Sequence, residues 1–295
     1  MKAFGRMIAI GLTVLSITRA QGAETWPIGM SFVGLKDGQW QLYLVAPNAE
    51  QPQPAPTALE PRTPTYHPQT GKVAYIGADG HLREITLETK TEQVLLEASP
   101  KQAYTQPAYD AEGKRLFVVA LQESASVDTD IVVLDESRQK TKPVVTQPLA
   151  QFEPHFQAPD TLYYSSVPCS LGCGKIIQEI WRIHLVSGEA EQVTLLNAIA
   201  RQPVVSSDRR SLYFASNKAG NYHLWRLALD TGQYQPLTRG AVTDSHPALD
   251  RDGQVYFIRH SPTGAQLMRR EADGALRVLS LPAAFDDLRD LEITP

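Results

Sequence analysis

Short runs of apolar and aromatic residues alternate with polar turns from about residue 28 to the C-terminus. Residues 73–76, 116–119 and 212–215 are examples: each is four residues long, rich in β-branched or aromatic side chains, and bounded by Asp, Gly or Pro. Such runs are typical of β-strands. No stretch sustains a 3.6-residue apolar period, so the pattern predicts an all-β chain.

The strand pattern repeats along the chain. Each copy opens with a polar residue and a proline, continues through a turn into an aromatic strand, and ends with another strand and a polar hairpin. The copies open at Thr63, Gln106, Glu153, Gln202 and His246. Their prolines are 43, 47, 49 and 44 residues apart, which is the period of a four-stranded propeller blade. We expect aromatic residues of the second strand, such as Tyr75, Phe117 and Phe214, to pack between blades.

The two ends of the chain supply the remaining blade. Residues 28–45 look like the middle of a blade without its opening strand, and the segment from Asp290 looks like an opening strand with nothing after it. Pairing them leaves no unprotected seam between the first and last blades. The sequence therefore predicts one domain, residues 24–295, folded as a six-bladed β-propeller closed by the C-terminal strand. Residues 46–62 contain five prolines and are expected to form an extended connector.

At these repeats the chain resembles the TolB-type propeller family, whose blades open with a Pro-x-aromatic-Ser-Pro-Asp-Gly-Lys signature. The nearer matches are 205–209 (VSSDR) and 249–253 (LDRDG), and Tyr66 and Tyr109 hold the aromatic position. The resemblance covers about residues 28–295. It implies a periplasmic protein that binds other proteins at one face of the ring. TolB has an α/β domain before its propeller, whereas this chain enters the first blade near Trp26, which puts the partners of TolB in doubt here.

The N-terminus has the pattern of a secretory signal peptide. Lys2 and Arg6 precede an apolar stretch, residues 7–17, that is shorter than the roughly 20 residues needed to cross a bilayer. We expect residues 1–20 to be removed by cleavage after Ala20, with Ala23 as the second choice; an uncleaved anchor is the alternative. The mature chain is then expected in the periplasm, not inserted in a membrane.

Charge narrows the choice of partner. The formal net charge is −4, and removal of the signal peptide leaves 25 basic against 32 acidic residues, a charge of −7. Nucleic acids and anionic lipids are bound largely through Lys and Arg, so neither is expected as a partner. A monomer that binds a periplasmic or outer-membrane-associated protein is expected instead.

One blade carries an insertion, residues 165–179, that should project as a constrained loop. Loops on a rigid scaffold often determine binding specificity, and we assign Pro168, Leu171 and Lys175 as candidate partner-binding residues. The loop also holds Cys169 and Cys173, the two cysteines of the chain. In an oxidising compartment they are expected to form a disulfide; a reduced or reactive pair is the alternative.

The residues that precede the repeat prolines should lie in register around one mouth of the central channel. They are Thr63, Gln106, Glu153, Gln202 and His246, with Asp290 in the sixth blade. Either this ring binds a partner's side chains or an ion, or its members hydrogen-bond backbone and channel water. No cofactor is required, but a channel-bound divalent cation is possible. Its candidate ligands are Glu153, His155, His246, Asp290 and Glu292.

Catalytic motifs are lacking. The sequence has no Gly-x-Ser-x-Gly elbow, no His-Glu-x-x-His zinc motif and no Ser-x-Asp-x-Gly-x-x-Trp box. This favours a binding module over an enzyme. The alternative is a carbohydrate-active lyase or hydrolase whose site lies in the channel and uses Glu153, His155 and His246.

Overall fold

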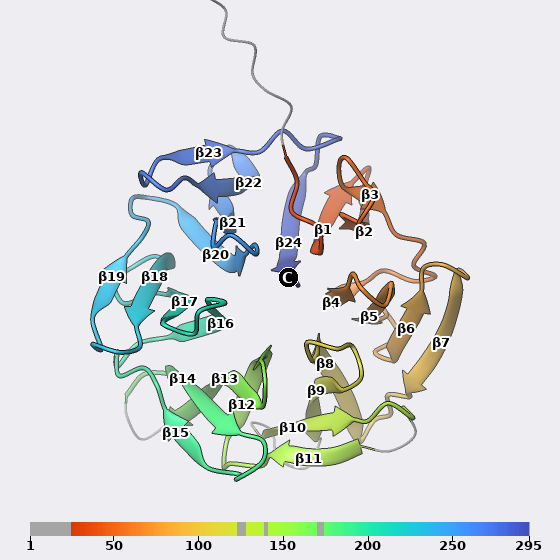
Figure 1. The fold of residues 1–295 in the computed structure, drawn as a ribbon, viewed down its shortest axis with the longest axis horizontal. Coiled ribbons are helices and arrows are strands. Elements are labelled where there is room, and N and C mark those ends of the chain that lie inside the picture. The colour runs from red at the N-terminus through yellow and green to blue at the C-terminus, as the bar shows by residue number, and fades with distance from the viewer. Residues whose placement is uncertain (1–24, 123–127, 139–140, 170–173, 295) are drawn as a thin grey trace, which may run out of the picture.

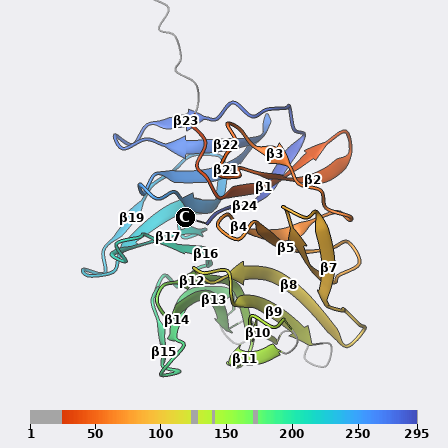
Figure 2. The ribbon, with the colours of Figure 1, turned by 45° about the vertical axis from the view of Figure 1, so that its right-hand side comes forward.

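The computed structural model describes residues 25–122, 128–138, 141–169 and 174–294. These residues form six four-stranded antiparallel sheets and no helix. The sheets are arranged as the blades of a closed ring, with the opening strands nearest its centre, as Figure 1 and Figure 2 show. The prediction of an all-β, six-bladed propeller is therefore confirmed.

Every blade is built in the same way, from an inner opening strand outward. Blade 1 consists of β24 and β1–β3, and blades 2 to 6 consist of β4–β7, β8–β11, β12–β15, β16–β19 and β20–β23. The opening strands are β24 (Asp287–Ile293), β4 (Arg62–His67), β8 (Gln102–Tyr109), β12 (Ala150–Gln157), β16 (Ala200–Val205) and β20 (Thr243–Leu249). The second strands are β1 (Met30–Lys36), β5 (Lys72–Ile76), β9 (Leu116–Gln122), β13 (Thr161–Cys169), β17 (Ser211–Ser216) and β21 (Val255–Ser261).

The fourth strand of each blade lies at the outer edge, and in every blade except blade 2 the outer two strands are together shorter than the inner two. The third strands are β2 (Gln39–Leu44), β6 (Leu82–Thr86), β10 (Thr129–Leu134), β14 (Ile177–His184), β18 (His223–Ala228) and β22 (Gly264–Arg270). The fourth strands are β3 (Gln53–Pro54), β7 (Thr91–Leu96), β11 (Thr141–Val145), β15 (Ala190–Gln192), β19 (Tyr234–Pro236) and β23 (Leu276–Val278). Short outer strands limit the backbone that is open to pairing with another chain.

The ring is closed by β24, which pairs antiparallel with β1. The closing strand begins at Asp287, three residues before the predicted start at Asp290. At the seam the amide of Thr294 donates to the carbonyl of Gly29, 3.2 Å away. Blade 1 is thus built from both ends of the chain, as the sequence predicted.

The core lies between blades. Along each second strand, alternate residues face opposite neighbours because side chains of a strand alternate in direction. Tyr75 packs in the cluster between blades 1 and 2, while Ala74 and Ile76 pack in the cluster between blades 2 and 3. Phe117 and Phe214 likewise pack between blades. The prediction that these aromatic residues fill the spaces between blades is confirmed.

Two predicted loops are partly wrong. The proline-rich segment 46–62 is not only a connector, because Gln53 and Pro54 form the fourth strand of blade 1 by pairing with Leu44 and Tyr43. The insertion 165–179 is partly a lengthened hairpin. Ser165 and Ser166 are buried in β13 and pair with Ile180 and Glu179 of β14. The sequence predicts a loop at Ser165 and Ser166 because polar residues lack the apolar pattern of a strand. The pairing with β14 that makes them a strand is visible only in the structure.

Some predictions concern residues outside the described part of the chain. Residues 1–20 of the expected signal peptide, both expected cleavage sites, Leu171 and Cys173 all fall there, so the signal peptide and the disulfide between Cys169 and Cys173 stay predictions. In the described ranges, no helix is long and apolar enough to cross a membrane.

Candidate functional site

The direction of the strands gives the ring two different faces. The opening strands all begin on one side of the ring. The hairpins that join second to third strands lie on that side, and so do the links from one blade to the next. We call this side the connector face. The opposite face carries the hairpins that join opening to second strands, such as residues 206–210. The later residues of each opening strand lie nearer to that opposite face.

Every opening strand carries a β-bulge at the same place. In blade 2, Arg62 pairs with Ile76 and Thr65 with Ala74, so one extra residue is inserted between them. The bulged residues are left-handed, with φ between 44° and 59°. We call them the central ring: Thr63, Gln106, Glu153, Gln202, His246 and Asp290. In five copies proline follows, because at a bulge its missing N–H costs no ladder hydrogen bond.

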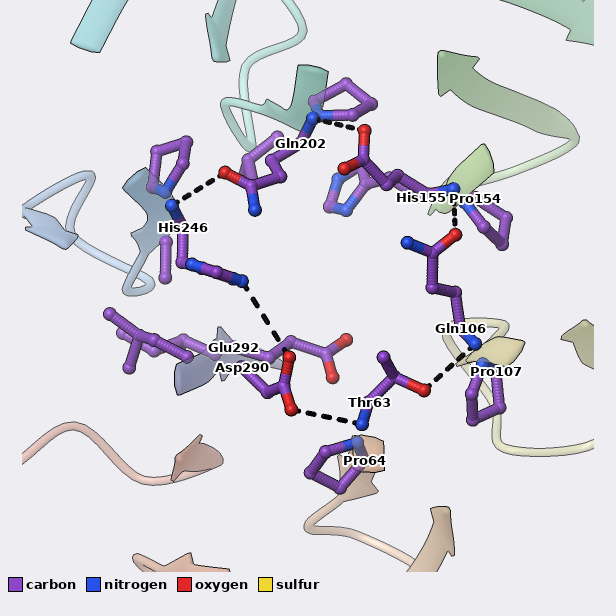
Figure 3. Close-up of a pocket in the computed structure, with 17 residues that line it drawn as sticks. Thr63, Pro64, Gln106, Pro107, Pro154, His155, Gln202, His246, Asp290 and Glu292 are labelled. Atoms are coloured by element: carbon purple, nitrogen blue, oxygen red, sulfur yellow. Dashed lines mark hydrogen bonds and ion pairs between the residues drawn. The ribbon is translucent and has the colours of Figure 1, made fainter. Parts of the chain in front are cut away.

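The central ring is held by hydrogen bonds that run from blade to blade (Figure 3). A bulge frees the backbone N–H of each ring residue from the sheet, and a buried N–H needs an acceptor. The acceptor is the side chain of the preceding ring residue. The donor–acceptor pairs are Thr63 N to Asp290 Oδ2 (3.1 Å), Gln106 N to Thr63 Oγ1 (3.0 Å), Glu153 N to Gln106 Oε1 (2.9 Å), Gln202 N to Glu153 Oε2 (2.7 Å) and His246 N to Gln202 Oε1 (2.8 Å).

The sixth step of the ring is different. Here Nε2 of His246 lies 3.8 Å from Oδ1 of Asp290, so two side chains approach each other in place of a side chain and an amide. The ring is thus a directional chain of five identical links with one looser contact between blades 6 and 1.

The central ring surrounds a cavity of about 150 Å³, and all six of its residues line it. Two further polar side chains lie one step deeper along the opening strands, two residues after the ring residues. They are His155 of blade 4 and Glu292 of blade 1. Blades 4 and 1 lie across the ring from each other in Figure 1. Both also line a second cavity of about 240 Å³ toward the opposite face. The channel therefore passes from one cavity to the other beside these two residues.

The three carboxyl groups of the channel are held in an environment that disfavours charge. Burial raises the pKa of Glu153, although hydrogen bonds from Ser165 and the Gln202 amide oppose the shift. Burial also raises the pKa of Asp290, and that of Glu292 rises to about 8 against a hydrogen bond from the Thr65 hydroxyl. Near neutral pH, Glu292 is therefore largely protonated and can donate as well as accept a hydrogen bond.

The two channel histidines are neutral. Burial lowers the pKa of His155 to about 4, and burial together with the charge of Arg201 lowers that of His246 to about 3. Nε2 of His155 accepts a hydrogen bond from the amide of Val205, 3.3 Å away. The proton of this neutral ring is consequently on Nδ1.

The predicted metal ligands meet in one cavity but not as a coordination group. Glu153, His155, His246, Asp290 and Glu292 all line the cavity. Within the described ranges, however, no three or more His, Cys, Asp or Glu side chains are close enough together to hold a metal ion. Two of the ring carboxylates instead accept backbone amides of the neighbouring blade.

Sequence reasoning missed a set of arginines beside the central ring. Arg62, Arg201 and Arg289 each precede a ring residue, a recurrence that is visible in the sequence. The guanidinium of Arg289 lies 4.0 Å from the ring centre of Trp40, and that of Arg201 lies 4.2 Å from Tyr222. Trp40 is the second residue of β2 and Tyr222 immediately precedes β18, so both lie toward the connector face. We call these two stacked pairs the arginine–aromatic rim.

The predicted loop residues lie away from the channel. Pro168 is exposed near the end of β13. Lys175 reaches toward blade 5 and donates from Nζ to the carbonyl of Asn197, 2.7 Å away. Both belong to the β13–β14 hairpin on the connector face, the same face as the central ring.

Comparisons with known proteins show the fold. No protein-family model matches the sequence, and no curated protein matches it either. Among solved structures, TolB from Acinetobacter baumannii has a TM-score of 0.73 at 19% identity over 90% of this chain. This chain spans 66% of the length of that protein.

Two further structures are similar. Putative TolB from Agrobacterium tumefaciens has a TM-score of 0.64 at 14% identity, over 84% of this chain and 87% of its own. An oligogalacturonate lyase in complex with manganese has a TM-score of 0.61 at 14% identity, over 84% of this chain and 73% of its own. The chain thus has the propeller fold of TolB, and the same fold also serves an enzyme.

Proposed function

We propose that this chain is a periplasmic protein-binding scaffold that engages an envelope protein through the connector face of the ring. The observation that supports it best is the central ring with its arginine–aromatic rim. The ring fixes polar groups around the channel mouth by links between blades, and the rim places Arg, Trp and Tyr beside them. These three residue types dominate the binding energy of protein interfaces.

Rigidity is the second support. A partner that docks on a preorganised surface loses little free energy in ordering that surface. Side chains of the ring already accept hydrogen bonds from the scaffold at 2.7–3.1 Å. The amide nitrogens of Gln106 and Gln202 remain to donate to a partner, since only their oxygens serve the ring.

Location and type of partner rest on the sequence. The expected signal peptide and the resemblance to TolB-type propellers favour the periplasm and an envelope protein as partner. The expected net charge of −7 disfavours nucleic acid. A periplasmic or outer-membrane-associated protein is therefore the proposed partner, and the propeller is proposed to act as a monomer.

The experiment compares two charge reversals on opposite faces. Arg62→Glu changes a side chain that is 53% exposed beside the central ring. Arg210→Glu is the matched control, because its side chain is 71% exposed in the hairpin between β16 and β17 on the opposite face. Purified mature chain, wild type or variant, is immobilised and used to capture proteins from envelope extracts. We expect a protein that is retained by the wild type and Arg210→Glu but lost by Arg62→Glu.

Two results would contradict the proposal. Retention that is equal for all three chains would place the contact elsewhere than the connector face. No retained protein at all, with folding verified by circular dichroism, would remove the basis for a binding scaffold.

A carbohydrate-active lyase or hydrolase is the second candidate. It is favoured by His155, which can donate from Nδ1 into the channel, and by Glu292, whose pKa of about 8 suits proton transfer. It ranks lower because the described residues that line the ring cavity include three carboxyl groups and no Lys or Arg, a poor environment for an acidic sugar. Incubation with oligogalacturonate and neutral oligosaccharides, followed by assays for unsaturated products and new reducing ends, tests it. Turnover that disappears in Glu292→Gln would favour the enzyme.

A further inference from the structure

A further concave surface lies between blades 5 and 6, toward the face opposite the connector face. It has a volume of about 250 Å³. Blade 5 lines it with residues of β17 and β18 and with residues in and just after β19, and blade 6 lines it with the β20–β21 hairpin and the end of β22. We call it the blade 5/6 groove. Every segment that lines it lies in the described part of the chain.

Strand register places one arginine on each wall of this groove. In blade 5, Arg226 of β18 pairs with Tyr213 of β17 and with Gln235 of β19, so the three side chains point to the same side of the sheet. Tyr213 packs in the apolar cluster between blades 5 and 6, so this side faces blade 6. In blade 6, Arg270 pairs with Val255, which packs in the same cluster. Arg226 and Arg270 therefore face each other across the groove.

The charges of these two arginines are not offset by a carboxylate. Nε of Arg226 donates to Oγ of Ser211, 2.9 Å away, which is a neutral acceptor that fixes the side chain. Nε of Arg270 is buried and has no hydrogen-bond acceptor among the described residues. Within the same ranges, neither guanidinium forms an ion pair. Two like charges on facing walls favour an anion between them.

The carboxylates near the groove are either paired elsewhere or exposed. Glu271 lines the groove but pairs with Arg269 at 2.7 Å and with Arg277 at 3.1 Å, so its charge is more than balanced. Asp208 accepts hydrogen bonds within its own hairpin. Asp252 lines the groove at the exposed tip of the β20–β21 hairpin. The groove is therefore positive, although the chain as a whole has a net charge of −4.

Neutral donors and apolar side chains complete the groove. The hydroxyl of Tyr213 and the side-chain amide of Gln235 lie on the same side of blade 5 as Arg226 and can donate to an anion. Leu237 and Val255 belong to the apolar cluster beneath them. A ligand with an anionic group and a small organic part matches this combination.

We propose that the blade 5/6 groove binds a phosphate group with two negative charges, either as inorganic phosphate or as a phosphate monoester. Guanidinium groups bind phosphate oxygens through pairs of N–H donors, and Arg226 and Arg270 on facing walls can hold a tetrahedral anion from both sides. A carboxylate carries one charge and is matched by one guanidinium. The groove is separate from the connector face, so this inference does not depend on the proposed function.

The test is a titration of the ¹⁵N-labelled mature chain, followed by amide chemical shifts near pH 7.5, where a phosphate monoester is mostly a dianion. The ligands are inorganic phosphate, glycerol 3-phosphate and acetate at equal ionic strength. We expect both phosphates to shift the signals of residues 226, 235, 252–255 and 270–272 and to bind about tenfold more tightly than acetate. Tighter binding of glycerol 3-phosphate would identify an ester as the ligand, and equal binding would identify free phosphate.

Three variants show whether the arginines act by charge. Arg226→Gln/Arg270→Gln should weaken phosphate binding at least about tenfold, because both guanidinium groups are lost. Lys90→Gln/Lys101→Gln is the control, which removes the same charge from exposed positions in and after blade 2 and should leave binding within about twofold. Asp252→Asn removes a negative charge from the edge of the groove and should strengthen binding about twofold.

Several results would overturn the inference. They are wild-type shifts that do not saturate, acetate binding as tight as phosphate binding, and unchanged binding by the double arginine variant with its folding verified by circular dichroism. Weaker binding by Asp252→Asn would also overturn it. If the double arginine variant does not fold, the comparison with acetate and the Asp252→Asn variant still decide, because both use a folded chain with its arginines intact.

Discussion

The six residues of the central ring adopt a left-handed backbone conformation that non-glycine residues rarely take. None of them is glycine, because each must also supply a side-chain acceptor or contact for the next blade. The strain of the backbone is offset by a hydrogen bond that satisfies a neighbour's amide. The sequence placed these residues at the channel by their register with the prolines, but it could not show that a bulge forms there.

Gln106 tests this double requirement. Gln106→Val removes the acceptor of the Glu153 amide and places a β-branched residue at φ 50°. We expect a loss of about 3 kcal/mol in the free energy of unfolding, from an unsatisfied N–H and added strain. Gln93→Val is the control, an exposed position in β7, and should change stability by less than about 0.5 kcal/mol. Urea denaturation measures both; equal losses would refute the role of the ring.

Glu292 should make stability depend on pH. Its pKa is about 8 in the folded chain and 4.5 as an ordinary Glu, so between these values the folded state binds more protons than the unfolded state. The contribution of Glu292 to stability is therefore fully present below about pH 4.5 and is lost as the pH rises through 8. Thermal melts from pH 5 to 9 should show a steeper decline for the wild type than for Glu292→Gln. Parallel curves would show that Glu292 does not titrate in this range.

Whether a segment forms a strand or a connector depends on the strand it pairs with, and composition reveals this only in part. The repeat period predicted the blades and their closure because every copy has the same order of apolar runs. The sequence predicts a connector at Gln53 and Pro54 because a two-residue strand among prolines has no apolar pattern of its own. Its pairing depends on β2, which lies in the same blade. The polar strand ends at Ser165 and Ser166 were missed for the same reason.

The seam between β24 and β1 offers a matched pair of glycines. Gly29 and Gly38 both have positive φ, 87° and 74°, but a Cβ on Gly29 would overlap the carbonyl oxygen of Thr294, whereas one on Gly38 meets nothing within 4 Å. Gly38→Ala should cost about 1 kcal/mol from backbone strain. Gly29→Ala should cost at least about 3 kcal/mol, since the clash adds to the strain. Denaturation curves that coincide for the two variants would show that the seam is not tightly closed.

The whole ring should unfold as one unit. The second strands pack on both neighbouring blades: β5 places Tyr75 against blade 1 and Ala74 against blade 3, and β9 places Val118 against blade 2 and Phe117 against blade 4. Loss of one blade therefore exposes two apolar faces. In an open array of repeats, an end unit can unfold at a low cost in free energy because it has one neighbour. Closure by β24 gives every blade two neighbours, so no such end unit exists.

Tryptophan fluorescence can test this cooperativity. Trp40 packs against the cluster between blades 1 and 2, and Trp181 against the cluster between blades 3 and 4. Variants that keep only one of them, with the other tryptophans replaced by Phe, should each show a fluorescence midpoint in urea equal to that from their own circular dichroism. A fluorescence midpoint that precedes the loss of ellipticity in either variant would indicate that blades open separately.

The location of the candidate site could be predicted from the sequence, but its chemistry could not. Register alone brought Thr63, Gln106, Glu153, Gln202, His246 and Asp290 to one cavity. That cavity raises the pKa of its carboxyl groups through burial, which no sequence pattern reports. The arginine–aromatic rim depends on stacking of an opening-strand arginine on an aromatic residue at or just before the third strand of the same blade. The sequence shows the recurrence of arginine at 62, 201 and 289 but not this stacking.

The hydrogen bonds of the central ring can be formed by several residue types. Thr, Gln, Glu and Asp all serve, because each link needs only one oxygen within reach of the next amide. The opening can therefore change in charge and width by single substitutions, such as Glu153→Gln, while the toroid beneath keeps its shape. The binding specificity of the channel mouth could therefore change toward a new partner while the fold of the propeller stays the same.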